Sequence, residues 1–424
     1  MKIAMFTNTY TPHVGGVANS VRRFTEQLRE RGHRVLVVAP VFPDQPEDEE
    51  AVHRVPAIQN FNGSDFSVAL PIKPDLDARL RDFGPDLLHA HHPYLLGDTA
   101  LRAEAELGTA LVFTHHTFYE HYTHYTPIDG EVFRQFVVEL STRYANLSDR
   151  VIAPSESVAA ILAERGVTTP IEPIPTGVDC ARFASGDGAA VRREAGIPPE
   201  AHVVGHLGRL AEEKNLAFLG DAVADYLGER EDAWFLVVGD GDFRDGLETR
   251  LRDRGVGDRT VFAGKRTGAD VVDAYHAMDV FAFASKSETQ GMVLVEAFAS
   301  GVPVVALDAP GARDVVRDGE NGRLVETESR EAFVAALQSL EPPRLEALAE
   351  GAQASAGRWS LTRSADRLEA LYKAVLGETR AGTDREASEW QTLQRRLERE
   401  WVLWSNRAAA LGDALTAPGG PSPS

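Results

Sequence analysis

Residues 280–296 read Val280-Phe281-Ala282-Phe283-Ala284-Ser285-Lys286-Ser287-Glu288-Thr289-Gln290-Gly291-Met292-Val293-Leu294-Val295-Glu296. The apolar run 280–283 is typical of a strand that is buried on both faces. A helical pattern begins at about Met292 and continues through Ser300, and Gly291 permits a close backbone approach at the turn before it. The segment therefore predicts one strand–loop–helix unit of an α/β fold, with two carboxylates near the turn.

The same alternation of short apolar runs and helical patterns continues along the chain. Strands are expected at 3–7, 35–39, 86–90, 110–114 and 151–153, and again at 203–207, 234–239, 261–263, 280–283 and 302–306, with helices such as 96–107 and 157–165 between them. Such alternation predicts parallel sheets covered by helices on both faces. The Pro- and Gly-rich stretch 170–200 interrupts the pattern as a linker does.

We therefore expect two α/β domains, at residues 1–172 and 173–358, followed by C-terminal helices at 359–417 that return to or pack on the first domain. In open α/β sheets, ligands bind beyond the carboxyl ends of the strands. Two such domains with facing sheets would form a cleft, and the polar motifs lie at those strand ends.

Composition narrows the class of protein. The 424 residues carry a formal net charge of −20, which argues against nucleic acid as a partner because nucleic-acid binding needs a basic surface. The single cysteine, Cys180, builds no disulfide framework and favours the reducing cytoplasm. The N-terminus reads as a buried strand and not as a signal peptide, and no run approaches the ~18 apolar residues of a membrane span. We expect any work at a membrane to be peripheral.

Two turns carry residues that suit a phosphorylated ligand. In 12–17 (Pro-His-Val-Gly-Gly-Val), Gly15 and Gly16 open a helix whose N–H groups can approach a pyrophosphate, although a tight turn explains the same pattern. The turn lacks the Gly-x-Gly-x-x-Gly spacing of a NAD site. Arg209 and Lys214 can bind phosphate, or can belong to an ordinary charged loop.

Glu288 and Glu296 lie eight positions apart, one in the loop and one in the helix. The two carboxylates can bind two ends of one extended ligand, or can be ordinary acidic residues near a helix N-terminus.

Together these motifs resemble those of a known family. The Glu-x7-Glu pair, Gly15-Gly16 and Arg209…Lys214 match, in order, the retaining glycosyltransferases of family 4 (GT4), which includes sucrose synthase-like and lipid-glycan mannosyltransferases. Residues 174–179 resemble its linker-proximal motif, with Thr176 where the family usually has Asn, and 301–305 and 311–322 are similar to its second domain. The resemblance covers roughly residues 1–376. It implies the GT-B fold, in which two Rossmann-like domains with parallel sheets face each other across a cleft.

The resemblance also implies roles for individual residues. Arg209 and Lys214 would neutralise the diphosphate leaving group, Glu288 would contact the donor sugar, and Glu296 would hold the ribose. Gly15 and Gly16 would approach the donor diphosphate or the acceptor, and the backbone amides of Gly291, Met292 and Val293 would bind sugar hydroxyls and phosphate. The donor is a nucleotide diphosphate-sugar, and no metal or other cofactor is implied. Asp240-Gly241-Asp242 is the nearest approach to a metal-binding pair, and we interpret it as a loop after a strand.

A run of histidines and aromatic residues, 113–125, follows the strand expected at 110–114. In the family, a His before a Thr at this strand end contacts the donor sugar and supports developing charge; His116 matches it, and His115 is the alternative. The segment 115–125, together with 91–101, resembles a narrower group, the bacterial diacylglycerol glucosyltransferases. We predict acceptor contacts from His13, Tyr119 and His121.

These resemblances predict transfer of a hexose, glucose from UDP-glucose, to a lipid such as diacylglycerol, with an α-glycosidic bond. Two alternatives stay open: a soluble or polysaccharide-linked acceptor with GDP-mannose as donor, and an inactive protein that binds sugar nucleotides. The family is thought to retain the anomeric configuration by front-side attack, so electrostatic stabilisation by Arg209 and Lys214 should dominate catalysis.

Two segments suit a lipid surface. Arg22, Arg23, Arg29 and Arg31 of the first helix can meet anionic headgroups or can form a solvated face. In the tail, a helical stripe can lie on a membrane, pair two subunits, or pack on the body of the chain, which is what we expect of it. The stripe consists of Leu393, Leu397, Trp401, Trp404, Ala408 and Leu411.

Overall fold

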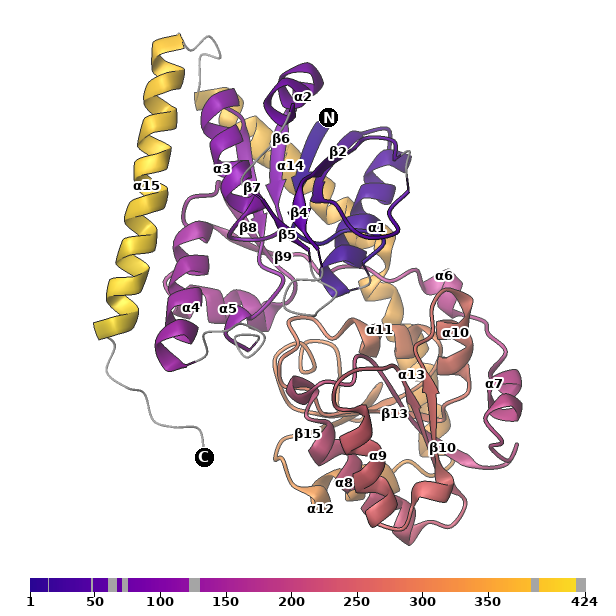
Figure 1. Cartoon of the computed structure of the whole chain (residues 1–424). Helices are drawn as coiled ribbons and strands as arrows, with labels where there is room; N and C mark the ends of the chain where they lie inside the picture. The colour runs from indigo at the N-terminus through magenta and orange to yellow at the C-terminus, as the bar shows by residue number, and fades with distance from the viewer. Residues whose placement is uncertain are drawn as a thin grey trace. The chain divides into compact units, whose positions relative to one another are not determined.

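The computed structural model describes residues 1–13, 15–46, 49–59, 67–70, 75–121, 130–382 and 389–416. These residues form two compact units: unit 1 comprises Met1–Thr176 with Ser364–Ser424, and unit 2 comprises Gly177–Arg363. Each unit is built on one parallel sheet (Figure 1).

Unit 1 contains a seven-stranded sheet in the order β3-β2-β1-β6-β7-β8-β9, and every neighbouring pair is parallel. Its strands are β1 (Lys2–Phe6), β2 (Arg34–Pro40), β3 (Val52–Val55), β6 (Leu87–Ala90), β7 (Ala110–Thr114), β8 (Arg150–Ala153) and β9 (Ile171–Pro173). A small antiparallel pair of strands, β4 (Ala57–Ile58) and β5 (Val68–Ala69), follows β3 along the chain.

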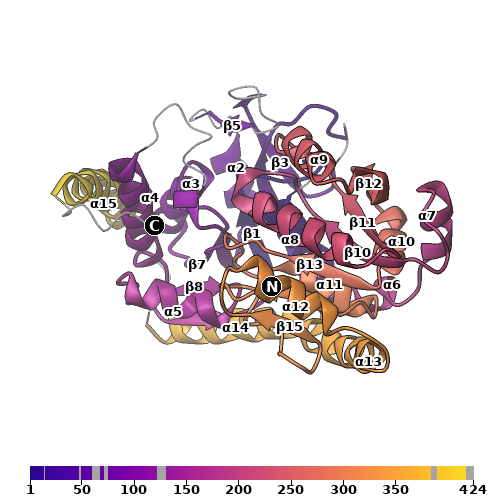
Figure 2. The ribbon, with the colours of Figure 1, turned by 90° about the horizontal axis from the view of Figure 1, so that it is seen from below.

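Helices cover both faces of this sheet because successive strand residues point to opposite sides. Ile3 and Met5 pack with α1 (Gly16–Glu30) and α14 (Leu361–Gly382), whereas Ala4 and Phe6 pack with the helices of the other face. The helices of that second face are α2 (Leu76–Phe83), α3 (Leu96–Leu107), α4 (Glu131–Ala145) and α5 (Glu156–Glu164). The last helix, α15 (Glu389–Thr416), lies against α3 and α4 (Figures 1 and 2).

Unit 2 contains a six-stranded parallel sheet in the order β12-β11-β10-β13-β14-β15. The strands are β10 (His202–Leu207), β11 (Ala233–Val238), β12 (Thr260–Gly264), β13 (Val280–Phe283), β14 (Val304–Leu307) and β15 (Gly322–Val325). One face packs against α6 (Cys180–Phe183), α7 (Gly188–Glu194), α10 (Ala269–His276), α11 (Met292–Ala299) and α13 (Arg344–Ala356), and the other against α8 (Leu216–Glu229), α9 (Arg244–Asp253) and α12 (Arg330–Gln338). Three short 3₁₀ turns, η3 (Glu212–Lys214), η4 (Gly257–Arg259) and η5 (Gly357–Trp359), complete the unit.

The predicted parallel α/β architecture is confirmed. Strands β7 and β13 and helix α3 have the predicted bounds, and most other predicted elements differ by one or two residues at an end. Strands β3, β4, β5, β9 and β15 were not predicted. The stretch 170–200, read as a linker, holds β9, α6 and α7 and contains the change from unit 1 to unit 2.

In each sheet the strand order reverses at one position, which is called the switch point. In unit 1 the chain moves from β1 to β2 on one side and to β6 on the other, and in unit 2 from β10 to β11 and to β13. Loops diverge at such points and leave a crevice at the carboxyl ends of the strands. The predicted site residues lie in the loops that follow β1, β7, β10 and β13, or in helices α1 and α11 that begin after two of those loops.

Candidate active site

In unit 2, an ion pair joins the two loops at the switch point. Lys214 lies in η3 after β10, and its Nζ donates to Glu288 Oε1 over 2.5 Å. Glu288 lies between β13 and α11, where Ser285 Oγ is 3.5 Å from the same oxygen. Both ionic side chains are less than one quarter exposed, at 16% for Lys214 and 23% for Glu288. The structure thus brings together two of the four residues predicted to be catalytic.

Arg209 lies on the same loop as Lys214, and its side chain is 41% exposed. Its guanidinium pairs with Glu213. Glu213 is itself held, because its backbone carbonyl accepts a hydrogen bond from Ser287 Oγ over 3.1 Å. An exposed guanidinium beside a half-buried ammonium is a suitable environment for a diphosphate, since Arg binds it through a planar fork and Lys through a point charge.

The start of α11 follows directly. Gly291, its N-cap residue, adopts the left-handed conformation with φ 64° and ψ 52°, which side-chain-bearing residues adopt only at a cost. No acidic side chain lies in the first turn, so the N–H groups of Met292 and Val293 stand at the positive end of the helix without a local carboxylate.

Glu296 lies one turn further along α11 and is 8% exposed. Tyr275 of α10 holds it: the Tyr275 hydroxyl lies 3.3 Å from Glu296 Oε2 and 3.2 Å from the Val293 carbonyl. Nothing in the local sequence marks Tyr275, which is 21 residues away and fully buried.

His206 of β10 is a second residue that the sequence analysis did not single out. It is 2% exposed, and its Nδ1 lies 3.1 Å from the Ala282 carbonyl of β13. Burial is the main cause that lowers its pKa to about 4, and the positive charge of Lys214 acts in the same direction. The imidazole is therefore neutral at pH 7 and adds no charge beside Lys214.

In unit 1, histidines gather after β6 and β7. His91 Nδ1 and His116 Nε2 are 2.9 Å apart, and the two rings stack with centroids 5.2 Å apart. Behind them, His89 bridges Tyr372 of α14 and Thr114 of β7, at 2.6 Å and 2.7 Å. His92 accepts a hydrogen bond from the Asn8 backbone N–H at Nδ1, over 3.1 Å. This bond fixes neutral His92 as the tautomer protonated at Nε2.

His115 and His116 have different surroundings although they are neighbours. His115 is 1% exposed, lies against the rings of Phe118 and Tyr119, and neither of its ring nitrogens has a hydrogen-bond partner in the described part of the chain. His116 is only half-buried and is bonded to His91. Of the two residues, His116 is the more exposed.

Burial also keeps these imidazoles uncharged. It lowers the pKa of His89, His92, His115 and His116 to about 3 and the pKa of His91 well below its usual value. The only carboxylate in the described loop after β7, that of Glu120, pairs with Arg165 over 2.5 Å. The strand ends of β6 and β7 therefore present neutral hydrogen-bonding groups.

The other predicted contacts of unit 1 lie in two loops. Gly15 precedes α1 in extended backbone, and a Cβ on Gly16 would meet nothing within 4 Å, so the backbone there is open. His13 stacks on Phe42 with centroids 5.8 Å apart. The Tyr119 hydroxyl is buried and burial raises its pKa, whereas His121 is exposed at the end of the described loop. Residues 122–125, the rest of the predicted histidine–aromatic run, lie outside the described residues.

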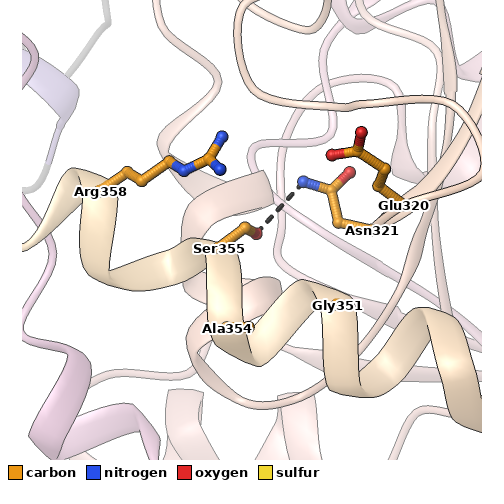
Figure 3. A pocket seen from close by; sticks show the side chains of 6 residues that line it. All are labelled: Glu320, Asn321, Gly351, Ala354, Ser355 and Arg358. Atoms are coloured by element: carbon orange, nitrogen blue, oxygen red, sulfur yellow. Dashed lines mark hydrogen bonds between the residues drawn. The ribbon is translucent and has the colours of Figure 1, made fainter.

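A pocket of about 210 Å³ lies elsewhere in unit 2, between α13 and the turn before β15 (Figure 3). Asn321, which is fully buried, donates to Ser355 Oγ and to the Val315 carbonyl and accepts from the Arg317 N–H, so its amide holds the turn. No predicted site residue lines this pocket.

Comparison with known proteins identifies the family. Residues 14–182 match the model of the family Glycosyltransferase Family 4, and residues 188–353 match the model of the family Glycosyl transferases group 1. A GDP-mannose-dependent alpha-mannosyltransferase of Mycolicibacterium smegmatis is 33% identical over 389 residues, which cover 89% of this chain and 98% of that one. An alpha-monoglucosyldiacylglycerol synthase of Streptococcus pneumoniae is 31% identical over 338 residues, covering 76% and 75%.

The chain belongs to glycosyltransferase family 4. It is a retaining hexosyltransferase that uses a nucleotide-sugar donor. Solved structures agree on the GT-B fold: sucrose-phosphate synthase of Thermosynechococcus elongatus superposes with a TM-score of 0.74 at 21% identity, covering 89% of this chain and 99% of that one. Anabaena HepE in complex with UDP-glucose superposes with a TM-score of 0.69 at 22% identity, covering 88% and 100%.

The basic residues of α1 have partners inside unit 1. Arg22 donates to Glu26, Arg31 to Asp366, and Arg29 to the backbone carbonyls of Val35, Glu50 and Ala51. Three of the four arginines that were candidates for anionic headgroups thus already bind groups of the protein. Among the described helices, none combines the length and the apolar character needed to cross a membrane.

Proposed function

We propose that this glycosyltransferase moves glucose from UDP-glucose to the hydroxyl group of diacylglycerol or a similar uncharged lipid, forming an α-glycosidic bond. One observation carries the choice of acceptor: the loops after β6 and β7 present neutral imidazoles, tyrosines and amides, and their one described carboxylate is paired. A phosphorylated acceptor would need cations at that position, whereas an alcohol needs neutral donors and acceptors.

Relatives support the same choice. The relatives from Streptococcus pneumoniae and Acholeplasma laidlawii that are named alpha-monoglucosyldiacylglycerol synthases align over 76% of this chain, at 31% and 26% identity. Because the lipid lies in a membrane and the nucleotide sugar is dissolved in the cytoplasm, we propose that the enzyme acts as a peripheral protein on the inner face of the plasma membrane.

The proposed division of labour assigns the donor to unit 2 and the acceptor to unit 1. Lys214 and Arg209 neutralise the diphosphate as it leaves, so the ammonium that now pairs with Glu288 is shared with a phosphate oxygen when the donor binds. Glu288 is then available to accept hydrogen bonds from sugar hydroxyls, Glu296 from the ribose, and the amides of residues 291–293 add donors at the positive end of α11.

In unit 1, Gly15 and Gly16 approach the donor diphosphate or the acceptor, and His13, Tyr119 and His121 contact the acceptor. His116 contacts the donor sugar. Its neutral ring offers a hydrogen bond to a sugar oxygen and a polarisable face to the positive charge that develops at the anomeric carbon, and His91 fixes the orientation of that ring.

A second candidate is mannosyl transfer from GDP-mannose to a soluble or glycan-linked acceptor. The specific observation in its favour is the Mycolicibacterium smegmatis mannosyltransferase, whose alignment spans 98% of that protein. The two donors differ in both base and sugar, so nucleotide release from each of them separates the two proposals.

The test is release of nucleoside diphosphate from UDP-glucose, GDP-mannose and ADP-glucose, with and without vesicles that contain diacylglycerol. We expect UDP release that requires the vesicles and a lipid product with an α-anomeric proton coupling. GDP release from GDP-mannose at the same rate with and without vesicles would favour mannosyl transfer over glucosyl transfer to a lipid.

A further inference from the structure

Helix α15 has one face in the core and another in solvent. Leu403, Ala410 and Ala414 are 5%, 0% and 4% exposed and pack against the body of unit 1. Five large apolar side chains of the same helix are 46–75% exposed: Leu393, Leu397, Trp401, Trp404 and Leu411. In the described chain only three other large apolar residues are exposed, Ile58, Leu95 and Val132, and each lies on a different element.

The exposed side chains lie on one face. Their spacing of four, four, three and seven positions repeats the helical period, and Ala408, also exposed, fills the remaining place. We call the row of Leu393, Leu397, Trp401, Trp404, Ala408 and Leu411 the apolar stripe. It extends over most of a helix about 42 Å long, and no charged residue lies within its arc.

Ion pairs hold the stripe outward. Four charged residues of α15 reach back to α3 and α4, along which the helix lies (Figures 1 and 2). The pairs are Glu400 with Arg102, Arg399 with Glu104, Arg407 with Asp98, and Asp413 with Arg143. Rolling the helix to bury the stripe would break all four pairs and expose Leu403. The stripe therefore faces solvent in this structure, which corrects the expectation that the stripe packs on the body.

The area and the charge of the stripe indicate what covers it. The five large side chains expose about 600 Å², taking roughly 150–250 Å² for a whole aromatic side chain. A second copy would bury at most about 1,200 Å² in total, at the lower limit for a stable dimer, and would bring one charge of −20 against another. Anionic lipid is opposed by the same net charge.

An uncharged lipid surface matches an uncharged row of Trp and Leu, because Trp prefers the boundary between headgroups and acyl chains. We propose that the apolar stripe of α15 docks this enzyme on a membrane region whose headgroups carry no net charge. The inference rests on the proposed lipid acceptor, since an enzyme that modifies diacylglycerol must stay at the surface in which diacylglycerol lies.

Co-sedimentation of the full chain with vesicles tests the proposal. The probe is phosphatidylcholine containing diacylglycerol, compared with the same vesicles after part of the phosphatidylcholine is replaced by phosphatidylglycerol. Trp401→Gln with Trp404→Gln should lower the partition coefficient on the order of tenfold or more, and Leu397→Gln with Leu411→Gln should do the same. Ile58→Gln changes an apolar residue outside α15 that is about as exposed as Leu411, at 50% and 49%; it is the control and should bind as the wild type does. Phosphatidylglycerol should not strengthen binding.

Equal binding by the wild type and both double variants would overturn the proposal. So would a wild-type chain that is dimeric by sedimentation equilibrium, becomes monomeric in the Trp variant, and ignores vesicles, because the stripe would then bind a second copy. If stripe-dependent binding is seen but no donor yields a glycolipid, the docking surface stands and the proposed acceptor is wrong.

Discussion

Acidification from pH 7 to pH 5.5 should remove about 5 kcal/mol of stability through the four most deeply buried histidines of unit 1, which are held neutral. His89, His91, His92 and His115 are all 0–5% exposed. Burial lowers the pKa of three of them to about 3 and that of His91 well below its usual value. In the unfolded chain the same side chains titrate near pH 6.5.

The sign follows from proton binding. Below pH 6.5 these histidines bind protons in the unfolded chain but stay neutral in the folded chain. The free energy of unfolding therefore falls as the pH falls, until the folded-state pKa values near 3 are reached. Between pH 7 and pH 5.5 each histidine contributes a loss of about 1.2 kcal/mol. At pH 5.5 the loss does not depend on the exact pKa of each histidine in the folded chain, provided that this pKa lies well below 5. Four such groups give about 5 kcal/mol, which is comparable with the whole stability of many proteins.

Urea unfolding followed by circular dichroism at the two pH values measures the loss, and His115→Phe is the matched variant. His115 lies between aromatic rings and its nitrogens have no partner in the described chain, so Phe removes one titrating group without removing a hydrogen bond. The variant should be at least as stable as the wild type at pH 7 and should lose about 1.2 kcal/mol less at pH 5.5. A wild-type loss below about 1 kcal/mol, or the same loss in both proteins, would refute the reasoning.

Three further predictions concern unit 2. Lys214→Gln should lower kcat by roughly 10²–10³, because it removes a charge that stabilises the leaving group and leaves Glu288 unpaired; a steady-state assay with kcat within threefold of wild type would contradict it. Gly291→Ala should cost about 1–2 kcal/mol in urea unfolding and raise KM for the donor, since the residue has φ 64°, and unchanged values of both would show that the turn tolerates a side chain. Tyr275→Phe removes the hydroxyl that holds the Glu296 carboxylate, so it should weaken donor binding by about 1 kcal/mol, which raises the donor KM several-fold and changes kcat little. A decrease in kcat with no change in KM would refute a positioning role for Tyr275.

Strands at the centre of each sheet were predictable from sequence because they are buried on both faces. Residues 110–114 and 280–283 are continuous apolar runs, and β7 and β13 have those bounds. Strand β3 carries His53 and Arg54, and β15 begins with glycine and arginine, and both lie at sheet edges, where a strand has a neighbour on one side only. These two edge strands lack the apolar run by which a strand is recognised.

The candidate site divides in a similar way. The motifs marked Lys214 and Glu288 separately, and the sheet order explains why they meet, since β10 and β13 are neighbours at the switch point. The groups that hold the site were not predictable. Tyr372 bonds His89 from 283 residues away, and no local pattern links a tyrosine in a C-terminal helix to a histidine in a strand.

Helix α15 shows why an apolar stripe alone does not reveal which face is buried. Its most apolar row contains Trp401 and Trp404 and faces solvent, whereas its buried face consists of Leu403, two alanines and ionic side chains that pair with α3 and α4. The sequence pattern favours packing by the apolar row, because burial of large side chains ordinarily contributes most. The partners on α3 and α4 lie about 300 residues away, at Glu104 for Arg399 and at Asp98 for Arg407, and so cannot enter such a pattern. Small alanines let the helix approach closely enough for those pairs to form. A large apolar row that is kept outward by ionic pairs on the other face is the arrangement expected of a surface that has a partner, and this is the reason to test α15 against lipid.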